Sequence, residues 1–438
     1  MTTIAASPPV LRPADVLQTW WPLAASWLLM GAEIPMVAAV VSRLGQPDIH
    51  LAAFGGVVFP LALVIEAPII MMLAASTALC RDEASYRRLK RFMITLSATL
   101  TVLHLLLVTT DAFEWVAGVV IGAPAEIVAP ARLGFALMLP WTWAIADRRF
   151  HQGLLIRLGH QRQIGVGTAA RLVGTLAVLG VGLTLDTIPG VAVAAAAMST
   201  GVLVEAAYAR GCIAMVRLDP ILTAAPPAVP LTSARLWHFY VPLALTPLIA
   251  LIAQPIGSAG ISRMPLALTS LAVWPVLNGL AFMLRSIGVA YNEVVVRHCE
   301  VPGGSAVLGR TAWCCGAAAS LVLALFAATP LAEWWFAGLS GLDAELTTLG
   351  RRALWFGVPL PLLSFLHSYY QGLLVTAHRT RGITEAVAVF LIVTAIGLWI
   401  GVATEALPGA AAALAAMSAG SAAQAGWLRW RCGALVRG

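Results

Sequence analysis

Two stretches of the chain, WPLAASWLLMGAEIPMVAAVVSRLG (21–45) and VPLALTPLIALIAQPIGSAGISRMP (241–265), share the same markers at a spacing of 220 residues. The shared markers are Pro-Leu-Ala at 22–24 and 242–244, proline at 35 and 255, and Ser-Arg at 42–43 and 262–263. Both stretches are apolar over the roughly 20 residues that a helix needs to cross a bilayer. The pattern predicts a duplicated membrane protein.

The repeat continues through most of each half, at a spacing that shortens to 219. The later matches are Arg132 with Arg351, Pro140 with Pro359, Gln152-Gly153-Leu154-Leu155 with Gln371-Gly372-Leu373-Leu374, and Arg162 with Arg381. Chance would rarely align proline, arginine and glutamine at one spacing over such a length. Internal repeats of this kind are typical of transporters, whose substrate sites lie near the bilayer midplane between the repeats.

The composition also places the chain in lipid. Of its 438 residues, 60% are hydrophobic and only 11% are charged, whereas soluble domains carry about 25% charged residues. The formal net charge is +7, but the basic residues occur in short clusters between apolar runs. That distribution indicates membrane topology rather than a nucleic-acid partner.

Twelve apolar runs are long enough to be spanning helices. We expect them at 19–42, 52–79, 93–112, 128–156, 163–184, 188–209, 237–260, 267–296, 309–329, 347–376, 383–403 and 406–428. Six spans per half is an even number, so the halves run in the same direction. The prediction is an all-α protein of two parallel, pseudo-symmetric six-helix bundles, at 1–216 and 236–438, joined by a Pro-rich linker at 217–235.

The loops between the spans alternate in charge. One set is basic and contains Arg81, Arg87, Arg88, Lys90, Arg91, Arg157, Arg162, Arg210, Arg217, Arg235, Arg297, Arg310, Arg379, Arg381 and, in the tail, Arg429, Arg431 and Arg437. The other set is acidic and contains Asp111, Glu114, Asp186, Glu333, Asp343 and Glu405. The positive-inside rule then places both termini in the cytoplasm of a multi-pass protein, which we expect in a bacterial inner membrane.

Prolines inside the expected spans predict kinks. The paired ones are Pro35 with Pro255 and Pro140 with Pro359. Each removes one backbone hydrogen bond of a helix. Kinked helices suit a protein that changes conformation.

The residues quoted above resemble a known group. Two parallel six-helix bundles with proline-kinked first and seventh helices are similar to the MATE-like fold of the multidrug/oligosaccharidyl-lipid/polysaccharide (MOP) exporter superfamily. Within it, Val241-Pro242-Leu243-Ala244-Leu245, Gln254-Pro255-Ile256, Ser262-Arg263 and Leu271-Ala272-Val273-Trp274-Pro275-Val276 resemble the progressive ankylosis (ANK) protein family. The resemblance implies export of anions such as pyrophosphate, nucleotides or citrate.

Charged residues at membrane depth are costly and are functional candidates by default. Arg285 is the strongest substrate ligand, since it lies twelve residues before Arg297 and hence near the midplane. Its repeat-matched position at a spacing of 220 is Ile65, and the adjacent Glu66 is either its ion-pair partner or a carrier of a coupling proton. Glu33, before Pro35, has the same two interpretations.

A second set of candidates lies on the matched spans 128–156 and 347–376. Arg148 and His367 each precede a repeated glutamine, Gln152 or Gln371, by four residues, which is one helical turn. Arg149 could also bind an oxyanion, because arginine matches phosphate and carboxylate oxygens. In the alternative, Asp147 forms an ion pair with an arginine that only joins helices.

The sequence gives weaker support for a functional role of the remaining polar residues. Gln254 and Asn278 are expected along a substrate path. Arg43 and Arg263 form an outer gate or, more simply, extend to the membrane interface. His104 and Arg171 are interpreted as packing or interface groups.

These patterns exclude several functions. The chain has no G-x-x-x-x-G-K-[ST] phosphate loop, no metal-ligand spacing and no paired catalytic acids, so we expect neither an enzyme nor a cofactor or metal. The leading hypothesis is a monomeric secondary transporter that exports anions by alternating access, with H+ or Na+ as coupling ion. The alternatives are a MATE-type drug or cation antiporter, which needs an acidic cavity, and a lipid-linked saccharide flippase, which needs a groove open to lipid.

Overall fold

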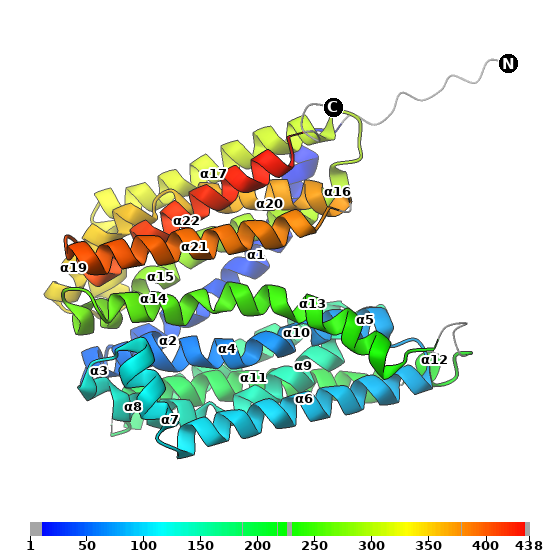
Figure 1. The fold of residues 1–438 in the computed structure, drawn as a ribbon, viewed down its shortest axis with the longest axis horizontal. Coiled ribbons are helices and arrows are strands. Elements are labelled where there is room, and N and C mark those ends of the chain that lie inside the picture. The colour runs from blue at the N-terminus through cyan, green and yellow to red at the C-terminus, as the bar shows by residue number, and fades with distance from the viewer. Residues whose placement is uncertain (1–10, 186, 217, 226–229, 378, 434–438) are drawn as a thin grey trace. The chain divides into compact units, whose positions relative to one another are not determined.

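The computed structural model describes residues 11–185, 187–216, 218–225, 230–377 and 379–433. These residues form helices and no strand, which confirms the predicted all-α class (Figure 1). Asp186, Arg217 and Arg437 of the charge pattern, and residues 226–229 of the predicted linker, lie outside the described residues.

The chain divides into two compact units, which we describe separately. The central unit comprises Met36–Pro275, and the terminal unit comprises Met1–Pro35 together with Val276–Gly438. These boundaries differ from the segments 1–216 and 236–438 that the repeat predicts. The helix at 13–31 packs within the terminal unit, and the helices at 233–261 pack within the central one.

The central unit contains most of the first repeat. Its elements are α2 (Glu33–Val41, which begins in the terminal unit), α3 (Pro47–Ala53), η1 (Phe54–Val58), α4 (Phe59–Ile70), α5 (Met72–Leu79), α6 (Glu83–Thr109), α7 (Ala112–Glu114), η2 (Trp115–Ile121), α8 (Ala125–Leu137), α9 (Leu139–Arg157), α10 (Arg162–Leu185), α11 (Gly190–Val216), α12 (Asp219–Leu222), α13 (Ser233–Leu251) and α14 (Ala253–Ile261). Helix α9 packs against α5, α6 and α11.

The terminal unit contains most of the second repeat. Its elements are α1 (Pro13–Gly31), most of α15 (Ala267–Val289), α16 (Tyr291–His298), α17 (Gly304–Ala328), α18 (Leu331–Glu333), η3 (Trp334–Leu339), α19 (Ala344–Gly357), α20 (Leu360–Thr376), α21 (Arg381–Thr404) and α22 (Gly409–Arg431). Helix α20 packs against α16, α17 and α22, and α1 packs against α16 and α17.

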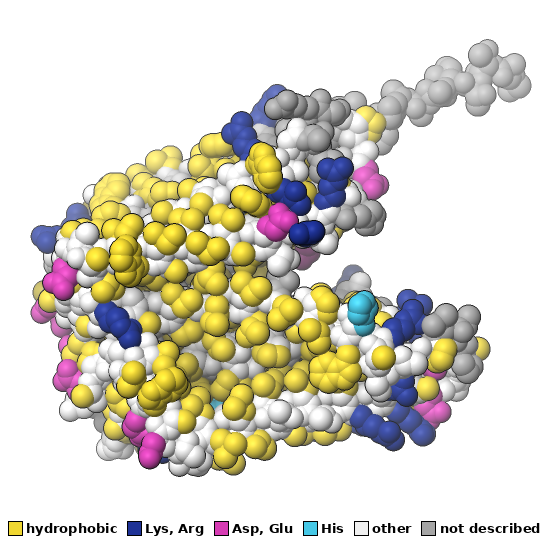
Figure 2. Space-filling view, in the orientation of Figure 1, with side chains coloured by type: hydrophobic (Ala, Val, Ile, Leu, Met, Phe, Trp, Pro, Cys, Tyr) yellow, Lys and Arg dark blue, Asp and Glu magenta, His cyan; other side chains and the backbone are white. Residues whose placement is uncertain are grey.

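Nine helical runs of the described chain are long and apolar enough to cross a membrane. They are 13–41, 47–79, 83–109, 162–185, 190–216, 233–261, 267–298, 304–328 and 381–404. The other three predicted spans are also helical, at 125–157, 344–376 and 409–431. The charged side chains of α6 gather in its first turns, and apolar side chains cover most of the rest of the helix (Figure 2).

Helix α6 begins ten residues before the predicted span, at Glu83 rather than residue 93. Asp82 caps this end, because its carboxylate accepts a hydrogen bond from the Ser85 amide at 3.1 Å. Four of the five basic residues of the predicted loop, all but Arg81, therefore lie on the first turns of a helix.

The predicted proline kinks coincide with helix breaks. The run 125–157 breaks at Met138, so that Pro140 lies in the first turn of α9, and the run 344–376 breaks just before α20, which Pro359 precedes. Pro35 and Pro255 likewise lie in the first turns of α2 and α14. A first turn tolerates proline because its amides have no partner within the helix.

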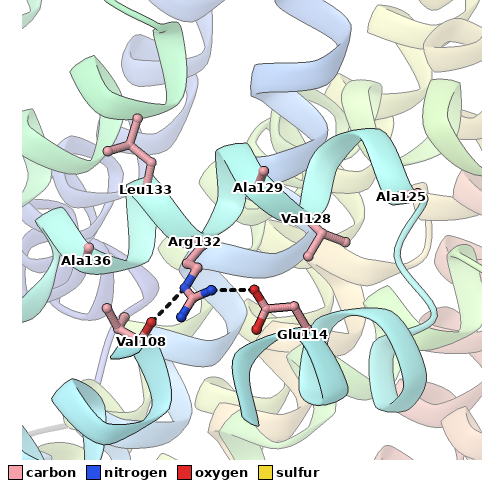
Figure 3. A pocket seen from close by; sticks show the side chains of 8 residues that line it. All are labelled: Val108, Glu114, Ala125, Val128, Ala129, Arg132, Leu133 and Ala136. Carbon is pink, nitrogen blue, oxygen red and sulfur yellow. Dashed lines mark hydrogen bonds and ion pairs between the residues drawn. The ribbon is translucent and has the colours of Figure 1, made fainter. Parts of the chain in front are cut away.

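The repeat is visible as matched local structure. The π-helical segments η2 and η3 begin at Trp115 and Trp334, 219 residues apart. Beside them, Arg132 pairs with Glu114 at 2.5 Å and Arg351 pairs with Glu333 at 2.8 Å, again at a spacing of 219. Figure 3 shows the first pair in its shallow pocket, where Arg132 also donates to the Val108 carbonyl oxygen at 2.7 Å.

The π-helical segment η1 explains why the repeat spacing changes from 220 to 219. Hydrogen bonds from i to i+5 accommodate one more residue than those of an α-helix. The equivalent part of α15 is α-helical, so the first repeat holds one extra residue at 54–58. Beyond that point α5 and α16 begin at Met72 and Tyr291, a spacing of 219. Arg285 therefore matches Glu66 itself, which corrects the expected match with Ile65.

Candidate functional site

The centre of the polar interior of the central unit is Glu205, on α11, whose side chain is 2% exposed. One of its oxygens lies 2.5 Å from an Arg148 nitrogen and 3.7 Å from an Arg171 nitrogen. The other accepts from the Gln152 amide at 2.9 Å and the Thr168 hydroxyl at 3.4 Å. We call these five residues the Glu205 cluster. A buried carboxylate with this many donors is fully compensated.

The local sequence of α9 and α10 builds this cluster. Arg148 and Gln152 are one turn apart on α9 and so point toward the same neighbour, α11. Thr168 and Arg171 are three residues apart on α10 and face the same carboxylate. Arg148 and Gln152 were predicted from the sequence as substrate ligands, whereas Arg171 was interpreted as a packing or interface group and Glu205 was not identified. The missed signal was a single glutamate within an Ala-rich span, which is a functional candidate in its own right.

Arg149 follows Arg148 on α9 but, unlike Arg148, does not pair with Glu205. Its guanidinium forms no hydrogen bond or ion pair with the described chain, and its Nε is buried. Glu66 on α4 is 6% exposed and faces Arg148, Arg149 and Arg171 electrostatically, yet it makes no ion-pair contact within the described residues. With Glu205, the region holds three arginines and two glutamates, which leaves one positive charge uncompensated.

The repeat-related positions of the terminal unit have different residues. At a spacing of 219, Glu66, Arg148, Arg149, Gln152, Arg171 and Glu205 correspond to Arg285, His367, Ser368, Gln371, Phe390 and Gln424. Of these six positions in the terminal unit, one is an arginine and one is a histidine, and none is an aspartate or glutamate.

Arg285 and His367 both belong to the terminal unit. They interact electrostatically, and a ring nitrogen of His367 lies 2.8 Å from the Ser421 carbonyl oxygen, which orients the imidazole. The guanidinium of Arg285 forms no ion pair with the described chain. Asn278 lies seven residues earlier on α15, on the same helix face, and its amide oxygen is buried without a hydrogen-bond partner. Arg148 belongs to the other unit.

Asp147 is separate from the Glu205 cluster. Its carboxylate lies 2.5 Å from a nitrogen of Arg210, on α11, and 3.4 Å from Nδ1 of His151, one turn along α9. This arrangement matches the alternative that Asp147 joins two helices. Gln254 and Gln371 are half-buried.

Arg263 caps a helix end. Its guanidinium donates to the carbonyl oxygens of Ile121, Val119 and Val120 at 2.7, 2.8 and 3.0 Å. These are carbonyls that the end of η2 leaves without partners. Arg43 similarly donates to the Ala39 carbonyl of its own helix. Both arginines are exposed, and these contacts favour a structural role over an outer gate.

Two further predicted groups are buried. Glu33, in the first turn of α2, is 3% exposed. His104 is fully buried and its ring nitrogens lie 2.9 Å from the Thr142 hydroxyl and from the Phe135 carbonyl oxygen. It is therefore a satisfied packing group, as the sequence argument expected.

No protein-family profile matches the chain, and no curated protein matches it in sequence. An inward-facing multidrug-resistance MATE family transporter of the MOP superfamily superposes with a TM-score of 0.72 at 14% identity, covering 95% of this chain and 99% of the other. The lipid II flippase MurJ in an inward closed conformation gives 0.62 at 11% identity, covering 92% and 87%.

A third neighbour comes from Pyrococcus furiosus. It is a MOP superfamily transporter described by the reverse polarity of its binding pocket, with a TM-score of 0.53 at 16% identity, covering 96% of this chain and 98% of the other. These similarities extend over nearly the whole length of each chain. The chain therefore has the MATE-like fold of the MOP superfamily transporters.

Proposed function

We propose that the protein is a secondary transporter that exports small anions by alternating access between two pseudo-symmetric bundles. The similarity to MATE transporters and MurJ supports transport as the activity. The predicted bundles, 1–216 and 236–438, are the proposed moving parts. The orientation with both termini in the cytoplasm of a bacterial inner membrane is part of the proposal.

The observation that favours an anionic substrate is that each unit contains an arginine at membrane depth with no ion-pair partner among the described residues. Arg149 and Arg285 both lie within membrane-depth helices, and neither guanidinium is paired within the described chain. An unpaired charge at this depth is costly unless a ligand or water compensates it. Arginine binds phosphate and carboxylate oxygens through parallel hydrogen bonds. The candidates are pyrophosphate, nucleotides and citrate, which the resemblance to the ANK family suggests.

A MATE-type cation antiporter is the first alternative, suggested by the multidrug transporter among the structural neighbours. Such a site requires a carboxylate that is free to pair with the cargo. Glu205 is already paired with two arginines, and Glu66 faces three. The reverse-polarity description of the Pyrococcus furiosus protein is a precedent for different pocket charge on this fold.

A flippase for lipid-linked saccharides is the second alternative, suggested by MurJ. A cationic site would suit this function as well. The two alternatives differ in the cargo that crosses the membrane, so one flux assay with three cargo classes separates them.

The test uses purified full-length protein in liposomes, with labelled pyrophosphate, citrate and ATP, an organic cation dye and a fluorescent lipid-linked saccharide. We expect flux of at least one anion and a reduction of roughly tenfold or more in both Arg149→Ala and Arg285→Ala, because each removes a charge-assisted contact. The matched control is Arg381→Ala, which removes an arginine whose side chain is 90% exposed. Flux of the cation or the lipid alone would overturn the proposal, and unimpaired anion flux in Arg285→Ala would overturn the site.

A further inference from the structure

The central unit has a groove at the basic end of α6, separate from the Glu205 cluster. It has a volume of about 570 Å³ and lies among α6, α9, α11 and the short helix α12. Lys90, Asp147, His151 and Arg210 supply its polar part. Its apolar walls include Met93, Ile94, Trp143, Ile213, Leu218 and Leu222.

Both cations of the groove are available to a ligand. The Lys90 ammonium lies 5.7 Å from the centre of the Tyr86 ring, and no ion pair within the described chain involves it. Arg210 uses one nitrogen for Asp147, while its side chain remains 62% exposed. Asp147, whose side chain is 5% exposed, pairs with Arg210 through one carboxylate oxygen and lies 3.4 Å from Nδ1 of His151 through the other. The groove thus presents two cations around a mostly covered carboxylate.

The apolar part of the groove continues onto the lipid-facing surface of α6. Ile94 lies one turn from Lys90 and is 40% exposed, and Leu105, three turns further along the same face of α6, is 43% exposed. Figure 2 shows this apolar surface along α6, with the basic side chains at its end. A ligand that fits must therefore carry negative charge at one end and hydrocarbon at the other.

The repeat-related positions of the terminal unit keep one of the four polar residues of the groove, since Arg210 corresponds to Arg429, and replace the other three. At a spacing of 219, Lys90, Asp147 and His151 correspond to Gly309, Leu366 and Tyr370. Leu366 and Tyr370 belong to the core of that unit, and a Cβ at Gly309 would lie 3.0 Å from the Tyr369 hydroxyl. The combination of Lys90 and Arg210 around Asp147 is therefore specific to one repeat, although the arginine itself is present in both.

We propose that this groove binds an anionic phospholipid of the leaflet on the basic side of the membrane. The phosphate contacts Lys90 and Arg210, and an acyl chain lies along Ile94 and Trp143. Basic pockets between helices at this depth suit anionic head groups. The inference is independent of the transported cargo.

The experiment is native mass spectrometry of the full-length protein in detergent, titrated with phosphatidylglycerol or phosphatidylcholine. We expect the wild type to retain phosphatidylglycerol preferentially and Lys90→Gln to bind it about fivefold more weakly, the usual effect of one basic residue near a lipid surface. Arg87→Gln is the matched control, because it removes an exposed cation of the same helix that pairs with Glu83. It should stay within about twofold of wild type.

A second variant, Arg210→Gln/Asp147→Asn, removes the other cation without leaving its buried carboxylate unpaired. We expect a loss similar to that of Lys90→Gln, with thermal unfolding as the check on folding. In vesicles, brominated phosphatidylglycerol should quench a fluorescence component that Trp143→Phe removes. Equal binding of both lipids, unchanged binding in both charge variants, or displacement of the lipid by inorganic phosphate would each overturn the proposal.

Discussion

The two units have residues of different charge at two pairs of repeat-related positions, one on α11 and α22 and the other on α4 and α15. In the central unit Glu205 compensates two arginines inside the protein. In the terminal unit the matched residue is Gln424, and Arg285 occupies the position that matches Glu66. The two repeats thus share the same backbone positions, and the residues at those positions determine whether an arginine is paired with a carboxylate. The predictions below test this difference in order of decreasing effect.

Glu205→Ala should have the largest effect on stability. It leaves Arg148 and Arg171 buried without their carboxylate, which typically costs about 3–5 kcal/mol. Gln424→Ala, its repeat-related control, removes a half-buried neutral side chain and should cost less than about 1 kcal/mol. Thermal and denaturant unfolding in detergent measure both, and equal losses would remove the central contrast between the units.

Gly201→Ala and Gly420→Ala should affect both units alike. A Cβ at Gly201 would lie 2.2 Å from the Thr175 hydroxyl oxygen, and one at Gly420 would lie 2.2 Å from that of Thr394. Thr175 and Thr394 match at a spacing of 219, so the helix contact is the same in each repeat. Overpacking of this kind costs roughly 1–3 kcal/mol. A large loss in one variant and none in the other would show that the two helix contacts are not equivalent.

Glu66→Gln should change transport more than stability. Neutral glutamine removes the carboxylate that faces three arginines, so we expect tighter anion binding, by roughly threefold to tenfold, from the larger positive charge. If Glu66 carries the coupling proton, a pH gradient should no longer drive uptake, while anion exchange persists. The liposome assay measures both, with Glu83→Gln as an exposed control on α6. Unchanged affinity together with full pH-driven uptake would exclude a role for Glu66 in either.

Arg132→Ala should cost about 1–2 kcal/mol and Arg351→Ala about 0–1 kcal/mol. Both lose a partly exposed ion pair, but Arg132 also donates to the Val108 carbonyl oxygen at 2.7 Å. The additional bond accounts for the expected difference. Equal losses in unfolding measurements would mean that the Val108 contact contributes little.

Much of the fold followed from local patterns. Apolar runs, charge alternation and paired prolines predicted the spans and their breaks, because these depend on how many consecutive residues meet lipid. The start of α6 was misplaced because its first turns are basic and face water, while the Asp82 cap still begins a helix there.

The candidate site was predicted less completely. Arg285 was identified from its membrane depth, and Arg148 with Gln152 and His367 with Gln371 from their one-turn spacing, because both signals can be read from a single helix. The partnership of Arg148 with Glu205 joins residues 57 apart and depends on how α9 packs against α11. The match of Glu66 with Arg285 required knowledge of η1, since a one-residue insertion leaves no clear mark in an apolar run.

By itself the sequence determined that the chain is a duplicated, all-helical membrane protein with arginines at membrane depth. Composition and repeat spacing carry that information locally, so they do not require packing to be known. Only the tertiary structure decided which arginines are compensated, since charge compensation depends on distances of a few ångströms between different helices. It also decided that helix 13–31 packs with the second repeat and helices 233–261 with the first, because side-chain packing, and not chain order, selects neighbours.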